Sequence, residues 1–338
     1  MENFVIVGDC HFGKKLHVDG FLDYQISEFL KIIDYCAENQ INNIIQLGDW
    51  FDNRTSIDFK LVQRINHEII QVLEEQKISV YYCAGNHDIY YKNENSINSV
   101  KLLFGESDVF HIVSDYPEEV DNILIVPWIS QSNQTECLKT IKNTNCDICV
   151  GHFDIAGFEM SKGYLNDKGM SKSIFKKFKK VYSGHFHLKG KQGNIEYVGS
   201  MCQLDWGDFE DAKQIIVFQN DKFESVQLTR ELFHKIELPN EINSDDFDKC
   251  ILKIYLNDKL DKKQNTILDN LIEHSILYET IDNSIILNDN QIDEVENESM
   301  ENIFTDYLSE QSEIDETDKQ EINKLFLELF NETRGLSL

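Results

Sequence analysis

The sequence is short of positive charge and of long apolar runs. It holds 32 Lys and Arg against 60 Asp and Glu, which gives a formal net charge of −28. A protein that coats nucleic acid through its phosphates needs a basic surface, so this class is disfavoured, although one local basic patch is still compatible. Apolar runs stay below the roughly 18 residues that a transmembrane helix needs, so we expect no membrane span.

A secretory signal is missing as well. The opening residues, MENFVIVGDC, run straight into a strand-like pattern, without the basic region and cleavage site of a signal peptide. Eight cysteines are scattered through the chain, several of them inside apolar runs, as reduced cysteines are in a cytosolic protein. We therefore expect a cytoplasmic location. Cys146 and Cys149 straddle the start of a predicted buried strand, so we interpret them as packing rather than as a redox motif.

The hydrophobic content of 41% is enough for a sizeable core. Strand-like apolar runs alternate with helical patterns up to about residue 230, which predicts an α/β fold whose sheet is covered on both faces. The predicted strands cover 4–9, 43–49, 78–86, 109–114, 123–129, 147–152, 180–185, 194–200, 214–219 and 223–228. The predicted helices cover 22–38, 57–76, 93–104, 132–143 and 171–179.

Beyond residue 230 the pattern changes twice. Residues 231–287 predict a small α/β capping domain, with strands at 249–256 and 276–281 around a helix at 262–274. From Gln264 to Asp318 the chain has no Lys or Arg and 16 Asp or Glu, and residues 288–299 are interpreted as an acidic linker. Residues 300–338 predict a helical segment, because five apolar residues at 318–333 follow helical spacing. They are Ile322, Leu325, Phe326, Leu329 and Phe330.

Five polar clusters each follow a predicted strand. They are IVGDCH with Asp9 and His11, QLGDWFD with Asp49, CAGNHD with Asn86 and His87, CVGHFD with His152, and YSGHFH with His185 and His187. In open α/β sheets, ligands bind outside the carboxyl ends of the strands, so these clusters are expected to converge. Each cluster alone would be an ordinary turn or a buried histidine, but five in order at strand ends indicate a built site.

The residue types point to a pair of metal ions. Carboxylates, imidazoles and one amide suit Mn²⁺, Fe²⁺ or Zn²⁺, and the absence of thiolates disfavours a structural zinc site. Asp49 could bridge two ions, because a carboxylate has two oxygens. Two metals about 3.5–4 Å apart clamp a phosphoryl group and ionise a water molecule. The pattern therefore predicts metal-dependent hydrolysis of phosphate esters.

The order D-x-H, G-D, G-N-H-D, G-H, G-H-x-H over residues 4–190 resembles the calcineurin-like metallophosphoesterase superfamily. The resemblance implies two mixed β-sheets flanked by helices. It also implies one metal on Asp9, His11, Asp49 and His187, and another on Asp49, Asn86, His152 and His185. His87 would act on the leaving oxygen as a general acid or transition-state stabiliser, and Asp88 would orient His87 by a hydrogen bond.

Within the superfamily, the stretch GHFHLKGKQGNIEYVGSMCQLDWGD resembles the SbcD-type nucleases, the bacterial and phage counterparts of the eukaryotic double-strand-break repair nuclease. GDWFDNR and GNHD differ from the motifs of Ser/Thr protein phosphatases. Some relatives have His where this chain has Asp52, so Asp52 is interpreted either as an acid that supports a metal ligand or as a structural acid. The resemblance implies Mn²⁺-dependent exonuclease and endonuclease activity on DNA, with Mg²⁺ or Fe²⁺ as other candidate metals. It implies an SbcC-like coiled-coil ABC ATPase as partner and, for a phage-encoded chain, the host cytoplasm.

Three surfaces are candidates for binding. Residues 162–191 contain nine lysines and one acid, a net charge of +8, so seven lysines are predicted to contact DNA: Lys172, Lys176, Lys177, Lys179, Lys180, Lys189 and Lys191. A solvated helix face is the alternative. The terminal helix would dock into the ATPase by its five apolar residues. Helices 22–38 and 57–76 could form a homodimer bundle, or their apolar residues could be core; the sequence leaves both open. The residues concerned are Phe29, Ile32, Ile33, Ile65, Ile69 and Leu73.

Two rival functions also remain open. One is a metallophosphoesterase that acts on a small nucleotide or phosphate ester. The other is a non-catalytic scaffold that recruits the ATPase.

Overall fold

The computed structural model describes residues 1–283, 315, 319 and 322–326. The chain forms two compact units, Met1–Asp282 and Asn283–Leu338. In the second unit residues 322–326 are helical, whereas the predicted acidic linker at 288–299 lies outside the described residues. Across the described part of the chain, no helix is both long and apolar enough to cross a membrane.

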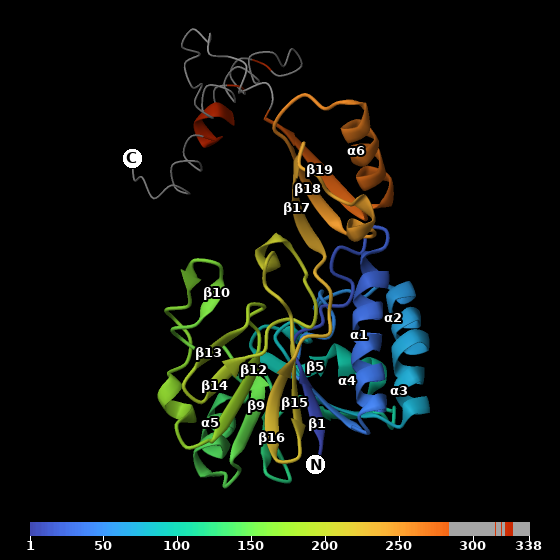
Figure 1. Cartoon of the computed structure of the whole chain (residues 1–338). Coiled ribbons are helices and arrows are strands. Elements are labelled where there is room, and N and C mark those ends of the chain that lie inside the picture. Colours follow the sequence, from blue (N-terminus) through green and yellow to red (C-terminus); the bar gives the residue numbers. More distant parts are fainter. Residues whose placement is uncertain (284–314, 316–318, 320–321, 327–338) are drawn as a thin grey trace. The chain divides into compact units, whose positions relative to one another are not determined.

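The first unit contains a six-stranded sheet with an unbroken parallel centre (Figure 1). Parallel strands β1, β2, β3 and β6 are extended by antiparallel β15 and β16 at one edge. In spatial order the strands are β16 (Lys222–Val226), β15 (Ile215–Gln219), β1 (Phe4–Val7), β2 (Asn43–Gln46), β3 (Ser79–Cys83) and β6 (Phe110–Val113).

A second six-stranded sheet also has four neighbouring parallel strands, but it carries one antiparallel strand at each edge. Its four central strands β14, β12, β9 and β8 are parallel, and each edge strand is antiparallel to its neighbour. In spatial order the strands are β13 (Gly190–Gln192), β14 (Ile195–Tyr197), β12 (Lys180–Gly184), β9 (Ile148–His152), β8 (Ile123–Val126) and β7 (Glu118–Val120).

The alternation of side chains along β1 shows how the layers are made. Phe4 and Ile6 pack in a buried cluster with Ile125 and Val150 of the second sheet, so the two sheets lie face to face. Val5 and Val7 point the other way and join the cluster built on the helices. A strand buried on both faces needs a nearly continuous apolar run, which is what FVIV supplies.

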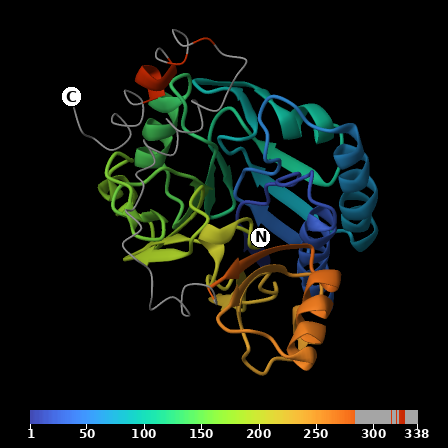
Figure 2. The same ribbon diagram turned by 90° about the horizontal axis from the view of Figure 1, so that it is seen from above.

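Helices cover the outer faces of the sheet pair, giving four layers (Figure 2). On the first sheet lie α1 (Phe21–Glu38) and a continuous helical stretch made of α2 (Phe59–Ile65), a π-helical turn (Asn66–Ile70) and α3 (Gln71–Gln76). On the second lies α5 (Gln134–Asn143), beside a 3₁₀ turn at Lys172–Phe175. The six apolar residues considered for a homodimer bundle in these helices are all fully buried in the core, so they are not available as an interface, and the homodimer itself stays a prediction.

One helix prediction began too early and another was wrong. The helix expected at 93–104 is confirmed only as α4 (Ser99–Phe104), because the residues before it form a hairpin of β4 (Ile89–Tyr91) and β5 (Glu94–Asn98). The Asn98 side chain accepts a hydrogen bond from the Lys101 N–H and so starts the helix late. Residues 171–179 form only the short 3₁₀ turn, because the Ser171 side chain caps a single turn before the chain enters β12. A further hairpin, β10 (Glu159–Ser161) with β11 (Tyr164–Leu165), lies between them in the sequence.

The region of the predicted cap forms a three-stranded parallel sheet with its own apolar cluster. The strands are β17 (Phe233–Leu238), β18 (Ile251–Leu256) and β19 (Leu277–Asp282), and α6 (Lys262–His274) connects the last two. Strand β17 was not predicted, since its pairing with β18 depends on tertiary contacts. Leu232, Phe233 and Ile251 extend into the main helical core, which ties this sheet to the rest of the first unit.

Candidate metal centre

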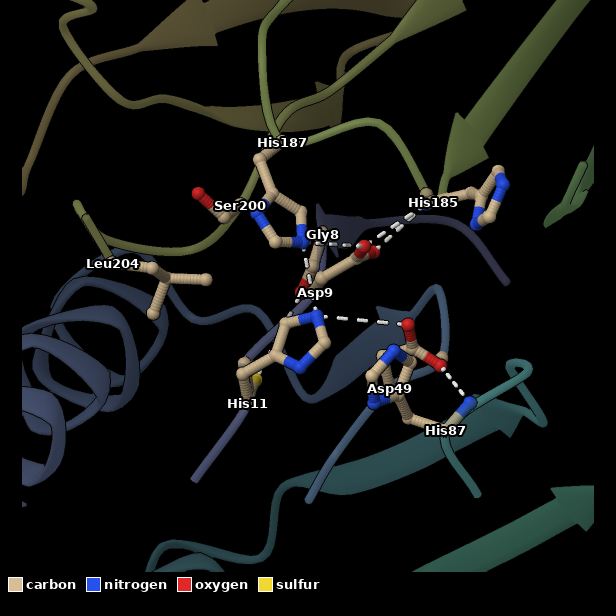
Figure 3. A network of polar contacts seen from close by, with 12 residues as sticks. Gly8, Asp9, His11, Asp49, His87, His185, His187, Ser200 and Leu204 are labelled. Carbon is tan, nitrogen blue, oxygen red and sulfur yellow. Dashed lines mark hydrogen bonds and ion pairs between the residues drawn. The ribbon is translucent and has the colours of Figure 1, made fainter. Parts of the chain in front are cut away.

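The five motif loops converge at the carboxyl ends of strands from both large sheets. Figure 3 shows the part of this site around Asp9, Asp49 and His187. Asp9 and His11 follow β1, Asp49 follows β2, and Asn86 follows β3. His152 ends β9, and His185 and His187 follow β12. The convergence expected from the sequence is present, and every donor is a nitrogen or an oxygen.

One group of donors consists of Asp9, His11 and His187. The Nε2 atoms of His11 and His187 are 3.0 Å apart, and Asp9 Oδ2 lies 3.9 Å from the latter. With metal–nitrogen bonds of about 2.0–2.1 Å, two nitrogens on adjacent positions of one ion lie about 3 Å apart. These three residues form a group that could hold a divalent ion.

A second group surrounds the Oδ1 atom of Asn86. His152 Nε2 lies 3.0 Å from this oxygen, and His185 Nδ1 lies 2.9 Å from it. Asp49 stands between the two groups, because its Oδ2 is 3.4 Å from His152 Nε2 and 3.6 Å from His11 Nε2. A single carboxylate therefore faces both sets of donors, as a bridging ligand does.

The histidines are also oriented from behind. His152 Nδ1 is 2.7 Å from the Leu47 carbonyl oxygen, and His11 Nδ1 is 3.1 Å from Asp52 Oδ1. Metal-binding histidines commonly donate their second ring N–H to a carbonyl or carboxylate, which fixes the other nitrogen towards the ion. Asp52, interpreted from the sequence as a supporting or structural acid, lies where such a partner of His11 is needed.

The buried charges of the site perturb one another strongly: burial opposes the shift, but Asp49 and Asp9 raise the pKa of His152 to about 10. Asp9 and Asp49 are almost fully buried. Burial, aided by the neighbouring Asp49, raises the pKa of Asp9 to about 6. The pKa of Asp49 is lowered: burial opposes this, but nearby His152 outweighs it. Burial lowers the pKa of His185 to about 3 and that of His187 well below its usual value, so both are neutral and able to bind a metal.

Three site residues have strained backbone. His11, Asp49 and His185 have φ values of 46°, 52° and 90°, a region that non-glycine residues seldom adopt. Gly48, at φ 101°, precedes Asp49, and a Cβ on it would lie 2.6 Å from the His152 ring. Such strain is retained where a fixed geometry is useful, and here it turns each side chain from the end of its strand into the crevice.

Asp88 differs from its predicted role. It was expected to orient His87, but its carboxylate instead accepts hydrogen bonds from the main-chain N–H groups of Asp49, Trp50 and Gly85. His87 Nδ1 is 2.5 Å from the Asp52 carbonyl oxygen, so the Asp52 main chain orients that ring. The reason is burial: the Asp88 side chain points down between two loops and is fully enclosed.

Sequence patterns missed two cations beside the motifs. The Arg54 guanidinium donates to the Asn86 carbonyl oxygen at 2.7 Å, and the buried Lys213 ammonium donates to the His187 carbonyl oxygen at 2.8 Å. Arg54 stands five residues after Asp49, so a basic residue so close to a motif was a usable signal. Lys213 is 26 residues from His187, and only the fold brings them together.

The predicted DNA-binding lysines do not form one patch. Lys179 forms an ion pair with Asp147, and Lys180 begins β12 at the end opposite to His185. Lys177 donates to main-chain oxygens near the end of α5, and the exposed Lys176 lies on the same turn.

The remaining three lysines lie on or beside β13, the strand that follows the last histidine motif. Lys172 donates to Gln192, Lys189 to the Ala212 carbonyl oxygen, and Lys191 pairs with Glu196. Lys189 and Lys191 are thus the members of the set closest to the site along the chain.

Two apolar surfaces are also exposed. Around a hollow of about 250 Å³ beside Arg54 lie Phe59, 92% exposed, and Leu102, 73% exposed. In the second unit Ile322 and Leu325 of the predicted partner-binding helix are exposed as well, and Phe326 is helical. Leu329 and Phe330 lie outside the described residues.

Comparison with known proteins agrees with this geometry. The model of the calcineurin-like phosphoesterase family matches residues 2–189. Exonuclease subunit 1 of enterobacteria phage T4 is 30% identical over 314 residues, which cover 90% of this chain and 91% of the phage protein.

Two solved structures resemble the fold more distantly. A nuclease, MPE, from Pseudomonas putida is 12% identical, over 66% of this chain and 87% of that one, with a TM-score of 0.32. A dimetal phosphatase from Danio rerio is 10% identical, over 67% of this chain and 98% of that one, with a TM-score of 0.39. Neither likeness is close enough to bear on function.

Proposed function

Because the chain belongs to the calcineurin-like phosphoesterase family and is a metal-dependent hydrolase of phosphodiester bonds, we propose that it is a two-metal nuclease that cleaves DNA. The observation that carries the proposal is the pair of donor groups around Asp49. One ion would be held by Asp9, His11, Asp49 and His187, and the other by Asp49, Asn86, His152 and His185. The site fits divalent ions because two buried carboxylates, an amide oxygen and imidazole nitrogens converge there.

When bound, two such ions polarise a phosphodiester and supply a nucleophilic water at neutral pH. The protein's own contribution is placement. His87 Nδ1 is held by the Asp52 carbonyl oxygen, so Nε2 is the ring nitrogen that this contact does not use. The His87 main-chain N–H donates to Asp49 Oδ1 at 2.7 Å, which ties the His87 loop to the carboxylate between the two donor groups. We propose that His87 stabilises or protonates the leaving oxygen.

DNA is the proposed substrate because the phage relative that matches nine-tenths of this chain is named an exonuclease subunit. Exonuclease activity with some endonuclease activity, in DNA recombination or repair, is the corresponding role. Mn²⁺ is the proposed metal, since mixed carboxylate and imidazole donors suit it, with Mg²⁺ or Fe²⁺ as alternatives. With a net charge of −28 the chain should bind DNA weakly on its own and lose it readily as salt rises.

A partner subunit is part of the proposal. The relative's name identifies it as one subunit of an exonuclease. We propose an SbcC-like coiled-coil ATPase, bound through the segment 300–338, whose Ile322 and Leu325 are exposed. We further propose a homodimer through the exposed apolar surface around Phe59 and Leu102, in place of the buried helix faces first considered. The domain boundaries at 230, 287 and 299 remain predictions.

The test uses the purified full chain with Mn²⁺ and end-labelled double-stranded DNA. Parallel assays contain p-nitrophenyl phosphate or bis(p-nitrophenyl) phosphate, and Asp49→Ala is the inactive control. We expect Mn²⁺-dependent shortening of the DNA that Asp49→Ala abolishes. Cleavage of the small esters with intact DNA would favour the small-ester phosphoesterase. No cleavage, even after the ATPase is added, would leave the scaffold and refute the nuclease.

A further inference from the structure

Lys213 is a buried cation that neither the sequence motifs nor the proposed reaction uses. Its side chain is 1% exposed, in the segment that leads into β15. The ammonium has three N–H donors and three acceptors: the His187 carbonyl oxygen at 2.8 Å, Asp208 Oδ1 at 2.7 Å and Asp211 Oδ2 at 2.7 Å. A lysine is rarely buried unless its charge is paired and its donors are all used, and here both conditions hold.

The two acids could hold this ammonium without help from the metal centre. Asp208 and Asp211 belong to one turn, and Asp208 Oδ2 also accepts the Leu204 main-chain N–H at 2.8 Å. The third contact, with His187, reaches instead into the motif loop. That carbonyl oxygen also accepts the Ser200 main-chain N–H at 3.0 Å, so it is fixed from two directions.

His187 depends on this fixation more than the fully buried donors Asp9, His11, Asp49 and His152 do. Its side chain is 26% exposed, whereas those of Asp9, His11, Asp49 and His152 are 0–2% exposed. His152 is held from behind through its Nδ1 atom and His11 Nδ1 lies 3.1 Å from Asp52 Oδ1, but among the described residues no side chain hydrogen-bonds Nδ1 of His187. The ring is therefore placed mainly by its main chain, and the main chain by Ser200 and Lys213.

We propose that Lys213 is a positioning residue of the metal centre, whose ammonium holds the His187 carbonyl so that the imidazole meets the ion shared with Asp9 and His11. The inference rests on the proposed function, because it presupposes that His187 is a ligand. The ammonium touches no substrate and acts through His187 alone. Its loss should weaken the ion on the Asp9 side and leave the ion on the Asn86 side unchanged.

The test must separate this role from simple support of the fold. Lys213→Met alone would leave two buried carboxylates unpaired, so the charge-matched double variant Lys213→Met/Asp211→Asn is used. Asp211→Asn is the matched control, because it alters the same turn and keeps the ammonium. Lys213→Arg, which keeps the positive charge, tests rescue. Each metal-free protein is titrated with Mn²⁺ by calorimetry and electron paramagnetic resonance, and its thermal unfolding is recorded in EDTA.

Wild type is expected to bind two Mn²⁺ ions. In the double variant one of the two should bind about 10–100-fold more weakly, as on loss of other residues that support metal ligands. The affinity for the second ion and the apparent KM for DNA should not change. The kcat should fall at limiting Mn²⁺ and recover at saturating Mn²⁺. Lys213→Arg should restore part of the affinity for the weakened ion. Asp211→Asn should bind both ions as wild type does.

Two outcomes would overturn the positioning role. One is a folded double variant with wild-type affinity at both sites. The other is a double variant that fails to fold while Asp211→Asn folds, because Lys213 would then support the fold rather than the site. Failure of the proposed function is visible separately, as a wild-type chain that binds no Mn²⁺ or binds two ions and leaves DNA intact.

Discussion

Replacing Asp88 should lower the stability of the folded protein and not only its rate of turnover. The carboxylate is fully buried and accepts three main-chain hydrogen bonds, at 2.7 Å from Asp49 and Gly85 and at 3.0 Å from Trp50. Hydrogen bonds to a charged group contribute about 1.5–3 kcal/mol each, so after partial relaxation Asp88→Ala should cost about 4–6 kcal/mol. For a unit of this size one kcal/mol lowers Tm by about 2 °C, so we expect a fall of about 8–12 °C.

The Tm of Asp88→Asn should lie between those of wild type and Asp88→Ala. Oδ2 takes the bonds from Asp49 and Gly85, and Oδ1 takes the bond from Trp50, so an amide can keep the first two and must lose the third. Thermal unfolding in EDTA, followed by circular dichroism, measures all variants without the contribution of bound metal. Alanine at the exposed Asp108 is the control. An Asp88→Ala protein that melts within 2 °C of wild type but has lost turnover would refute this reasoning and restore the role first expected, orientation of His87.

Three further predictions concern the site and its surfaces. His87→Asn should abolish DNA cleavage and leave two bound Mn²⁺ ions, and loss of an ion in the metal titration would contradict the role given to His87. The double variant Lys189→Gln/Lys191→Gln should weaken DNA binding. It should also reduce the slope of log binding constant against log salt concentration by up to one unit for each lost phosphate contact. Neutralising Lys179 and Lys180 removes the same charge and should change neither the affinity nor the slope. Phe59→Glu should convert a dimer to a monomer in analytical ultracentrifugation, with unchanged thermal unfolding, and a wild-type monomer would refute that surface as an interface.

The sheets could be predicted because their strands are buried on both faces. Strands such as FVIV can be identified in the sequence without knowledge of the strands that they pair with. A short apolar run followed by glycine and a polar residue is itself the signal. The hairpin at Ile89–Asn98 could not be found in this way, because Ile97 and Val100 also fit a helical period. Asn98 was the available clue to the start of the helix, because it is a preferred N-cap residue whose side chain accepts a hydrogen bond from the N–H three positions later.

For the site, the sequence shows the donor residues that would bind the ions, but not the groups that orient those donors. Each donor follows its own strand, so spacing and strand order were sufficient. The supporting groups come from elsewhere in the chain: the Leu47 carbonyl behind His152, Asp52 behind His11, and Lys213 behind His187. Such contacts depend on three-dimensional packing. Leu47 and Asp52 both lie within the QLGDWFD motif, but the Leu47 contact uses a main-chain carbonyl that residue type does not reveal, so only Asp52 could be noticed.

The distribution of donors over two sheets has an energetic consequence. Asp9, His11, Asp49 and Asn86 follow strands of the first sheet, and the three remaining histidines follow strands of the second. Asp49 faces His152, and His11 faces His187, across the junction between the sheets.

Ions held there would cross-link the two sheets at the point where the buried Asp9 and Asp49 carboxylates lie. Binding to the folded state alone stabilises by RT ln(1 + [L]/Kd), about 2.7 kcal/mol at a hundredfold excess over Kd for one ion. The two sheets already share an apolar interface, so metal should raise Tm without being required for folding. The centre is thus built by packing first, and the ions complete it.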